Sequence, residues 1–304
     1  MNEKMQSQPY PGVSLADHRE AFINDRLYWN HGGPVMAYTR DQTIDTPDGP
    51  VAVRYHLPTR DDAGPALVYL HGGGFALGNL ETHDRIMRTV AHVSGATVVG
   101  VDYALSPEAK FPVALRQCVA VVRRLRAGER GVDPARIGLG GDGCGAMLAL
   151  ATSLCLRDEG DDDVTALLLY CGQFYLRQNA GQYLADPRDV TSPYVDCLGA
   201  DLTGLPPTFI AAAELDPLSE DSVTLAGILD AKGVTNRHTV YPGALHSFIH
   251  NSRNQSTAER ALRDGAQFFF DIVHLGTPIA GEASICSQAG SDLVEVGPVL
   301  AGAL

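Results

Sequence analysis

The chain has 304 residues, of which 45% are hydrophobic and 19% charged, a balance typical of a soluble globular protein with one large core. Its net charge of −13 at pH 7 argues against nucleic acid and anionic membrane surfaces as partners, because both would repel it. No apolar segment of signal-peptide or membrane-spanning type is evident, so we expect a cytoplasmic protein that acts on a small molecule.

Cysteine and histidine are spread along the chain without metal-binding spacing. There are six cysteines and ten histidines, and they form no CxxC pair and no HExxH motif. We therefore expect reduced, mostly buried thiols, no metal site and no cofactor.

Short apolar or β-branched segments alternate with helical periodicity along most of the chain. This alternation predicts an α/β protein with a mostly parallel, doubly wound sheet, whose ligand site lies at the carboxyl ends of the strands. The strands are predicted at 51–57, 66–71, 96–101, 136–140, 165–171, 207–213 and 238–241. The helices are predicted at 82–93, 113–125, 146–157, 220–232 and 256–272.

Three segments fall outside this alternation. Residues 1–45 are predicted to form an N-terminal cap segment, and the core at 46–276 carries a short helical cap insertion at about 173–203. The tail at 277–304 is rich in small residues and lacks aromatics, so we expect it to be disordered or to dock on a partner chain. A homo-oligomer is compatible with such a tail.

A glycine-rich loop follows the second predicted strand. It reads His71-Gly72-Gly73-Gly74-Phe75, and its missing side chains allow backbone N–H groups to approach a ligand closely. Such a loop can form an oxyanion hole, although glycine triplets also occur in simple turns.

A second glycine motif lies between a predicted strand and a predicted helix. Gly141-Asp142-Gly143-Cys144-Gly145 has the spacing of the nucleophile elbow G-x-S-x-G, whose flanking glycines let strand and helix backbones pass close together. Its central residue, Gly143, has no side chain.

Two later segments follow strands in the order typical of α/β-hydrolases. Asp216 lies in Ala213-Glu214-Leu215-Asp216-Pro217, and His246 lies in the segment 241–248. An isolated Asp-Pro or His is usually structural, but the order elbow, acid, histidine favours a catalytic acid and base.

These sequence segments resemble those of the hormone-sensitive-lipase family of esterases and, within it, of the bacterial acetyl esterases. The resemblance rests on HGGGFALGNLETHDRIMR (71–88), VDYALSPEAKFP (101–112), RIGLGGDGCGAMLALA (136–151), AAELDPL (212–218), YPGALHSFIH (241–250) and ALRDGAQFF (261–269). It implies the α/β-hydrolase fold over nearly the whole chain except its two ends. The cap insertion is shorter than in that family.

The resemblance also implies roles for individual residues. Asp216 and His246 match the acid and base, while Gly143 matches the nucleophilic serine. The oxyanion and substrate-binding positions are Gly72, Gly73, Gly74, Asp142, Gly143 and the N–H of Cys144.

Three functions remain open for an acyl or carbonyl substrate. The first is non-hydrolytic general-base chemistry by His246: elimination of a small carboxylate, dehydration or cyclisation, as in related plant carboxylesterase-like proteins. The second is ester hydrolysis with Cys144 as nucleophile, although its register is shifted by one residue. The third is a non-catalytic ligand-binding or scaffold protein.

Overall fold

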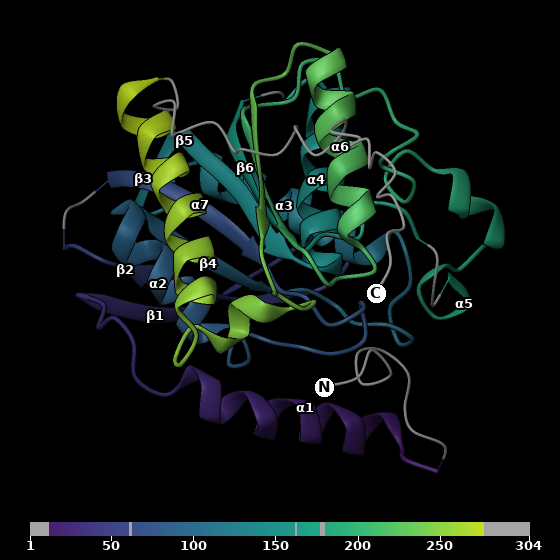
Figure 1. Cartoon of the computed structure of the whole chain (residues 1–304), viewed down its shortest axis with the longest axis horizontal. Coiled ribbons are helices and arrows are strands. Elements are labelled where there is room, and N and C mark those ends of the chain that lie inside the picture. The colour runs from purple at the N-terminus through teal and green to yellow at the C-terminus, as the bar shows by residue number, and fades with distance from the viewer. Residues whose placement is uncertain (1–11, 61–62, 162, 177–179, 277–304) are drawn as a thin grey trace, which may run out of the picture.

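A computed structural model describes residues 12–60, 63–161, 163–176 and 180–276. In this part of the chain a single eight-stranded sheet carries helices on both faces (Figure 1). The strands are β1 (Tyr38–Ile44), β2 (Val51–Leu57), β3 (Ala63–Leu70), β4 (Thr97–Asp102), β5 (Gly131–Asp142), β6 (Val164–Tyr170), β7 (Thr208–Ala213) and β8 (Asn236–Tyr241). The α-helices are α1 (Leu15–Asn30), α2 (Asp84–Ser94), α3 (Val113–Arg126), α4 (Cys144–Asp158), α5 (Ala180–Tyr183), α6 (Ser219–Ala231) and α7 (Ser256–Leu275).

The sheet has the predicted doubly wound topology of an α/β-hydrolase. Its strand order is β1-β2-β4-β3-β5-β6-β7-β8, antiparallel at β1–β2 and β2–β4 and parallel from β4 onward. Because the central strands are covered on both faces, they consist of nearly continuous apolar residues. The carboxyl ends of the parallel strands therefore meet at one edge, where the loops of the site lie.

The predicted helices agree with α2, α3, α4, α6 and α7 within a few residues, whereas the N-terminal segment differs. Strand β1 lies inside the segment 1–45 that we expected to form only a cap, and it pairs with β2 from Tyr38↔Leu57 to Ile44↔Val51. The sequence does not predict this strand because YTRDQTI has no alternating apolar face. In the structure, Ile44 is its one buried residue.

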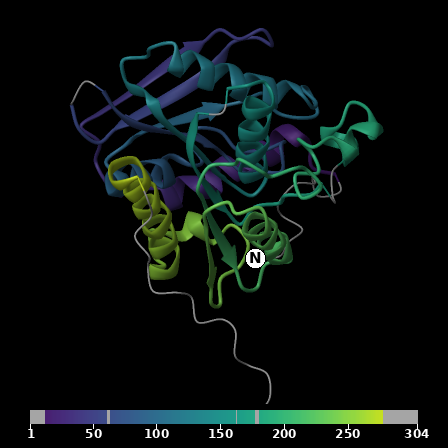
Figure 2. The same ribbon diagram turned by 90° about the horizontal axis from the view of Figure 1, so that it is seen from above.

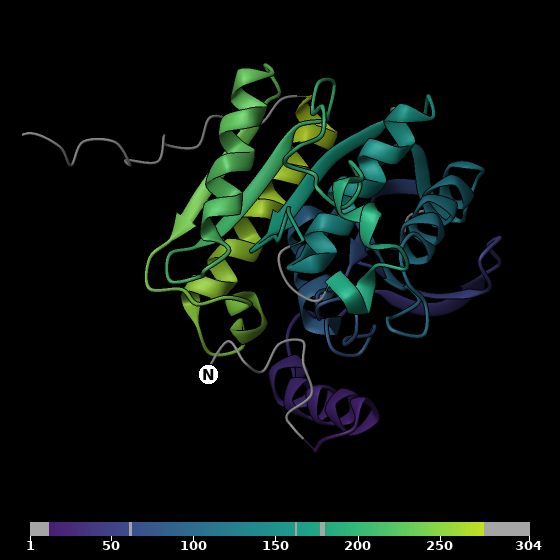
Figure 3. The ribbon, with the colours of Figure 1, turned by 90° about the vertical axis from the view of Figure 1, so that its right-hand side faces the viewer.

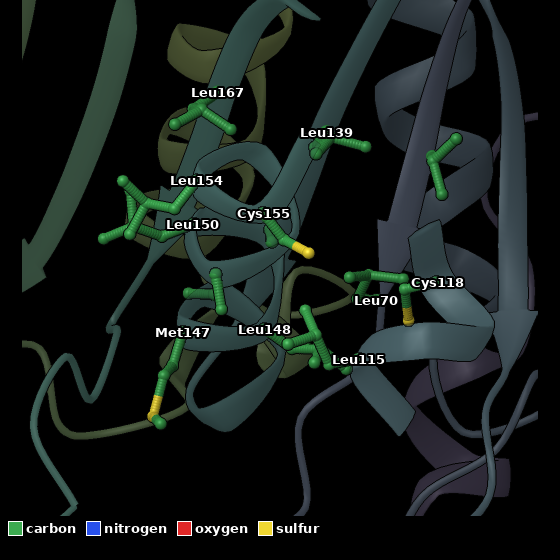
Figure 4. Packing of buried hydrophobic residues seen from close by; sticks show 14 of the residues in the cluster. Leu70, Leu115, Cys118, Leu139, Met147, Leu148, Leu150, Leu154, Cys155 and Leu167 are labelled. Carbon is green, nitrogen blue, oxygen red and sulfur yellow. The ribbon is translucent and has the colours of Figure 1, made fainter. Parts of the chain in front are cut away.

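Two hydrophobic layers enclose the sheet. One layer contains side chains of α3, α4 and α6, and the other contains side chains of α2 and α7. Figure 4 shows Leu150 and Leu154 of α4 on the side of Leu167 of β6, and Leu148 on the side of Leu115 of α3. Helix α4 is buried from Cys144 to Leu156, so the turn at its start is held between two fixed elements.

Helix α1 lies outside these layers, and three short helical elements connect the larger ones. Helix α1 runs along the lower edge of the molecule in Figures 1 and 3, while α5 projects on the side opposite to α7 (Figures 1 and 2). The 3-10 helix η2 (Pro187–Thr191) follows α5, and η3 (Phe248–Asn251) precedes α7. The segment 277–304, expected to be disordered or docking, lies outside the described residues.

The described helices include none that is both long and apolar enough to cross a membrane. Five cysteines in the described ranges are free and buried, as expected: Cys118, Cys144, Cys155, Cys171 and Cys197.

Candidate active site

The turn from β5 into α4 has the backbone conformation of a sharp elbow. Gly143 has φ 55° and ψ −120°, and it caps the N-terminus of α4, which begins at Cys144. Its N–H donates to the carbonyl oxygen of Tyr170 over 2.9 Å, which ties the elbow to the end of β6. A positive φ of this kind is strained for residues with a side chain.

The three glycines of this turn differ in the space around them. A Cβ on Gly141 would collide with the carbonyl oxygen of Leu70, and so would a Cβ on Gly145. A Cβ on Gly143 would instead lie 3.8 Å from His246 Nε2 and 4.0 Å from Cε1 of the same ring. No other non-neighbouring atom of the described chain lies within 4 Å of that position, so packing leaves room for a side chain at residue 143.

His246 and Asp216 form a close pair facing the elbow. His246 Nδ1 lies 2.7 Å from Asp216 Oδ2, and the other carboxylate oxygen accepts the N–H of Leu218 over 2.9 Å. The Asp216 side chain is 1% exposed and that of His246 15%. A carboxylate at Nδ1 keeps the proton on that nitrogen, so Nε2 is the free acceptor directed at residue 143.

Backbone contacts hold the two loops that carry this pair. The N–H of Leu215 donates to the carbonyl of Ala244 over 2.9 Å, and the N–H of Gly243 donates to Glu214 Oε2 over 2.7 Å. Because each loop bonds to the other, the 2.7 Å separation of acid and base is set by the backbone as well as by the side chains.

The glycine loop after β3 takes a conformation that requires glycine. Gly73 has φ 127°, and a Cβ there would collide with the carbonyl oxygen of Leu77. Gly74 and Phe75 each have φ 62°. Glycine leaves the backbone N–H groups of this loop open to an anionic oxygen, which is the role expected for it.

The sulfur of Cys144 lies on the oxyanion-loop side of the elbow. It accepts the N–H of Phe75 over 3.2 Å and lies 3.9 Å from the Tyr103 hydroxyl. No hydrogen bond joins it to His246 among the described residues. Burial raises the pKa of this thiol from an ordinary value of 9.0 to about 11, so it is protonated at neutral pH.

A cap residue lies against the oxyanion loop. The ring of Tyr183, at the end of α5, stacks on Phe75 with centroids 3.7 Å apart. Lys110 holds this cap by donating from Nζ to the carbonyls of Gly181 and Leu184, over 2.8 and 3.2 Å. The cap insertion therefore forms part of the wall beside the elbow.

Asp142, predicted to line the oxyanion or substrate site, instead lies behind the elbow. Its side chain is 3% exposed, and its Oδ1 accepts the Tyr69 hydroxyl over 2.9 Å and the N–H of Gly72 over 3.1 Å. His83 and His250 contact the same carboxylate. Its carboxylate thus holds the oxyanion loop through the N–H of Gly72.

The structure brings most of the predicted residues to one place: the glycine loop, the elbow, Asp216 and His246. Sequence reasoning missed several residues of this region, namely Tyr69, His83, Tyr103, Tyr183 and His250. His83 lies within the segment ETHDRIMR, but an isolated histidine forms no motif with a recognisable spacing. Only the fold brings it beside Asp142.

Comparison with known proteins gives a consistent result. The family model described as alpha/beta hydrolase fold matches residues 67–180 and 174–250. An esterase from Pyrobaculum calidifontis is 30% identical, with a TM-score of 0.84 over 89% of this chain and 97% of that one. A thermophilic carboxylesterase cloned from a metagenomic library is 28% identical, with a TM-score of 0.84 over 87% and 99% of the two chains.

Proposed function

Because the chain belongs to the α/β-hydrolase family and is an enzyme of that superfamily, we propose that it catalyses general-base chemistry on a small acyl or carbonyl compound. In this proposal Gly143 stands at the position of the hydrolase nucleophile, and His246 acts directly on the substrate. The esterases that resemble the chain make an acyl or carbonyl group the natural substrate class.

One observation carries this proposal. The Nε2 of His246, with its proton placed on Nδ1 by Asp216, is directed at a position beside Gly143 that no side chain fills. A base in this arrangement can take a proton from a substrate atom located where a serine hydroxyl would otherwise lie.

The reaction that fits is elimination from a β-substituted carbonyl compound, which is a dehydration when the β-substituent is a hydroxyl group. His246 Nε2 removes the proton α to the carbonyl, and the C–H electron pair forms an enolate. The N–H groups of Gly73, Gly74 and Cys144 stabilise its oxygen. The enolate then expels acetate or hydroxide as the double bond forms, and the imidazolium returns its proton to the leaving group.

Hydrolysis through Cys144 has less support. Its sulfur is bonded to the Phe75 amide, and its raised pKa of about 11 keeps it as a thiol. A protonated thiol without a base in contact is a poor nucleophile.

Proton exchange tests the proposal directly. In D₂O, the enzyme should exchange the α-hydrogen of small β-acyloxy and β-hydroxy carbonyl compounds, measured by NMR, and His246→Ala should abolish the exchange. Cys144→Ala should preserve it. A covalent acyl adduct on Cys144, found by mass spectrometry of the wild-type protein with a short ester, would instead establish thiol-dependent hydrolysis.

A further inference from the structure

Three buried side chains converge behind the elbow from separate parts of the chain. His83 lies just before α2, Asp142 ends β5 and His250 lies in η3; one ligand atom from each lies within 4.8 Å of the others. Asp142 Oδ2 is 3.4 Å from His83 Nε2 and 3.5 Å from His250 Nε2. Their side chains are at most 4% exposed.

The hydrogen bonds of Thr82 determine which nitrogen of His83 carries a proton. The Thr82 hydroxyl donates to the carbonyl of Asn79 over 2.8 Å and accepts the N–H of that residue over 2.9 Å. With that proton directed at the carbonyl, we infer that His83 Nδ1, 2.8 Å away, is the donor of their shared bond.

The other nitrogen of a neutral His83 then meets the carboxylate with a lone pair. His83 Nε2 lies 3.2 Å from Asp142 Oδ1 and 3.4 Å from Oδ2, and both are acceptors when the carboxyl group is ionised. Facing acceptors in a dry interior are unfavourable unless a cation lies between them.

His250 provides a second imidazole. Its Nε2 lies 3.5 Å from Asp142 Oδ2, and its side chain is 4% exposed. Neutral imidazole and carboxylate are the ligand types that Zn²⁺ takes together in proteins.

We propose that His83, Asp142 and His250 bind a divalent transition metal of the zinc class. Bonds of about 2.0–2.1 Å place neighbouring ligands of a tetrahedral zinc ion about 3.3 Å apart. The separations of 3.4 and 3.5 Å around Asp142 Oδ2 are close to this spacing. Tyr69 and Gly72 both donate to Oδ1, which orients the carboxylate and leaves Oδ2 available to the ion.

Such an ion would be structural, because it would be enclosed by side chains that are at most 4% exposed, where a substrate could not reach it. It would join the end of β5, the start of α2 and η3, and Asp142 would transmit the restraint to the N–H of Gly72 in the oxyanion loop. This inference goes beyond the proposed function and does not depend on it.

Arg26 of α1 provides an additional test of charge. Its side chain is 12% exposed, its guanidinium lies 3.3 Å from Asp25, and its charge acts on both Asp142 and His250. A metal ion would be repelled by this positive charge. Arg26→Gln should therefore strengthen metal binding severalfold. An unchanged metal affinity in this variant would count against an ion beside Asp142.

The experiment uses the full chain, stripped with a chelator and then titrated with Zn²⁺. We expect one ion per chain by elemental analysis after gel filtration, a melting temperature that rises with Zn²⁺ concentration, and nitrogen-ligand absorption bands when Co²⁺ replaces Zn²⁺. His250→Asn should weaken binding by about 100-fold. His56→Asn is the matched control, because His56 is also buried and lies 3.4 Å from a carboxylate, that of Asp84, outside the cluster.

The absence of stoichiometric Zn²⁺ binding would overturn the proposal and would indicate that a proton on His83 compensates Asp142. Equal affinity in His250→Asn and wild type would also overturn it. If His250→Asn does not fold, imidazole NMR signals of the wild-type protein decide the question: Zn²⁺ must shift the signals of His83 and His250. Shifts confined to other histidines count against the site.

Discussion

The two halves of the candidate active site differ in what they retain. The loops of Asp216 and His246 have both the backbone contacts and the side chains of an acid–base pair, with 2.7 Å between Nδ1 and Oδ2. The elbow has the strained backbone, with φ 55° at Gly143, but no side chain at its centre. The turn thus has the backbone conformation of an elbow without a side chain at its centre, and the proposed general-base reaction rests on this combination.

Restoring the missing side chain should give the largest effect. From the Cβ position 3.8 Å from His246 Nε2, a serine Oγ comes within hydrogen-bond reach of the base. We expect Gly143→Ser to raise hydrolysis of nitrophenyl acetate by about 10⁴-fold, since losing such a nucleophile costs on the order of 10⁶-fold in known enzymes. The rate of nitrophenol release, followed by absorbance, measures the hydrolysis in both proteins.

The control for that experiment is Gly143→Ser combined with His246→Ala, which should remove the gained rate. A folded Gly143→Ser protein with no gain on acetyl, propionyl or butyryl esters would show that His246 is not aimed at residue 143.

A second change tests the acid within the same background. Asp216→Asn removes the negative charge that holds the proton on His246 Nδ1, so the base adopts the wrong tautomer. We expect the esterase rate of Gly143→Ser to fall by about 10³-fold in the double variant. An unchanged rate would mean that the 2.7 Å contact does not control the ring.

Alanine substitutions at two glycines of the elbow should differ in how much stability they cost. Gly145→Ala places a methyl group against the carbonyl oxygen of Leu70 and should cost about 3 kcal/mol or prevent folding. Gly143→Ala meets only the strain of its positive φ, roughly 1–2 kcal/mol. Urea unfolding gives both values, with the exposed helical Gly227→Ala, which has open space around it, as a neutral or stabilising control. Equal losses at residues 143 and 145 would contradict the difference in space.

The smallest effect is expected at Cys144. Cys144→Ala should leave α-proton exchange within about tenfold of wild type, because only a packing contact is lost. The folded pKa of about 11 lies above the ordinary value of 9.0, so the folded state keeps a proton that the unfolded chain releases. The contribution of this thiol to stability is thus complete below pH 9 and falls as the pH rises toward 11.

Iodoacetamide labelling checks the thiol assignment. Cys144 should remain unlabelled at pH 8 and react only as the pH approaches 11. Rapid labelling at neutral pH, accompanied by loss of proton exchange, would transfer the catalytic role to the sulfur.

The sequence predicts the sheet, the major helices and the order of the site loops because each depends on local periodicity or on a short motif. It does not predict β1, whose edge position leaves it with a polar sequence. Nor does it predict that Asp142 turns away from the elbow toward His83 and His250, residues separated from it by 59 and 108 positions (142 − 83 and 250 − 142). Contacts between distant segments are set by the tertiary fold, and a single sequence contains no direct sign of them.

Helix α1 differs from α4 in the way it is attached. In α1 only His18 is buried, whereas α4 is buried from Cys144 to Leu156. Arg19 connects α1 to the carbonyls of Ala76 and Ser106 over 2.8 and 3.0 Å, next to the oxyanion loop. A helix attached mainly by polar contacts can detach in a local opening while the sheet stays folded, so its amides should exchange with solvent far faster than those of α4. The attachment of α1 beside the oxyanion loop is then a local folding equilibrium, sensitive to salt through the pair that Arg19 forms with Glu108.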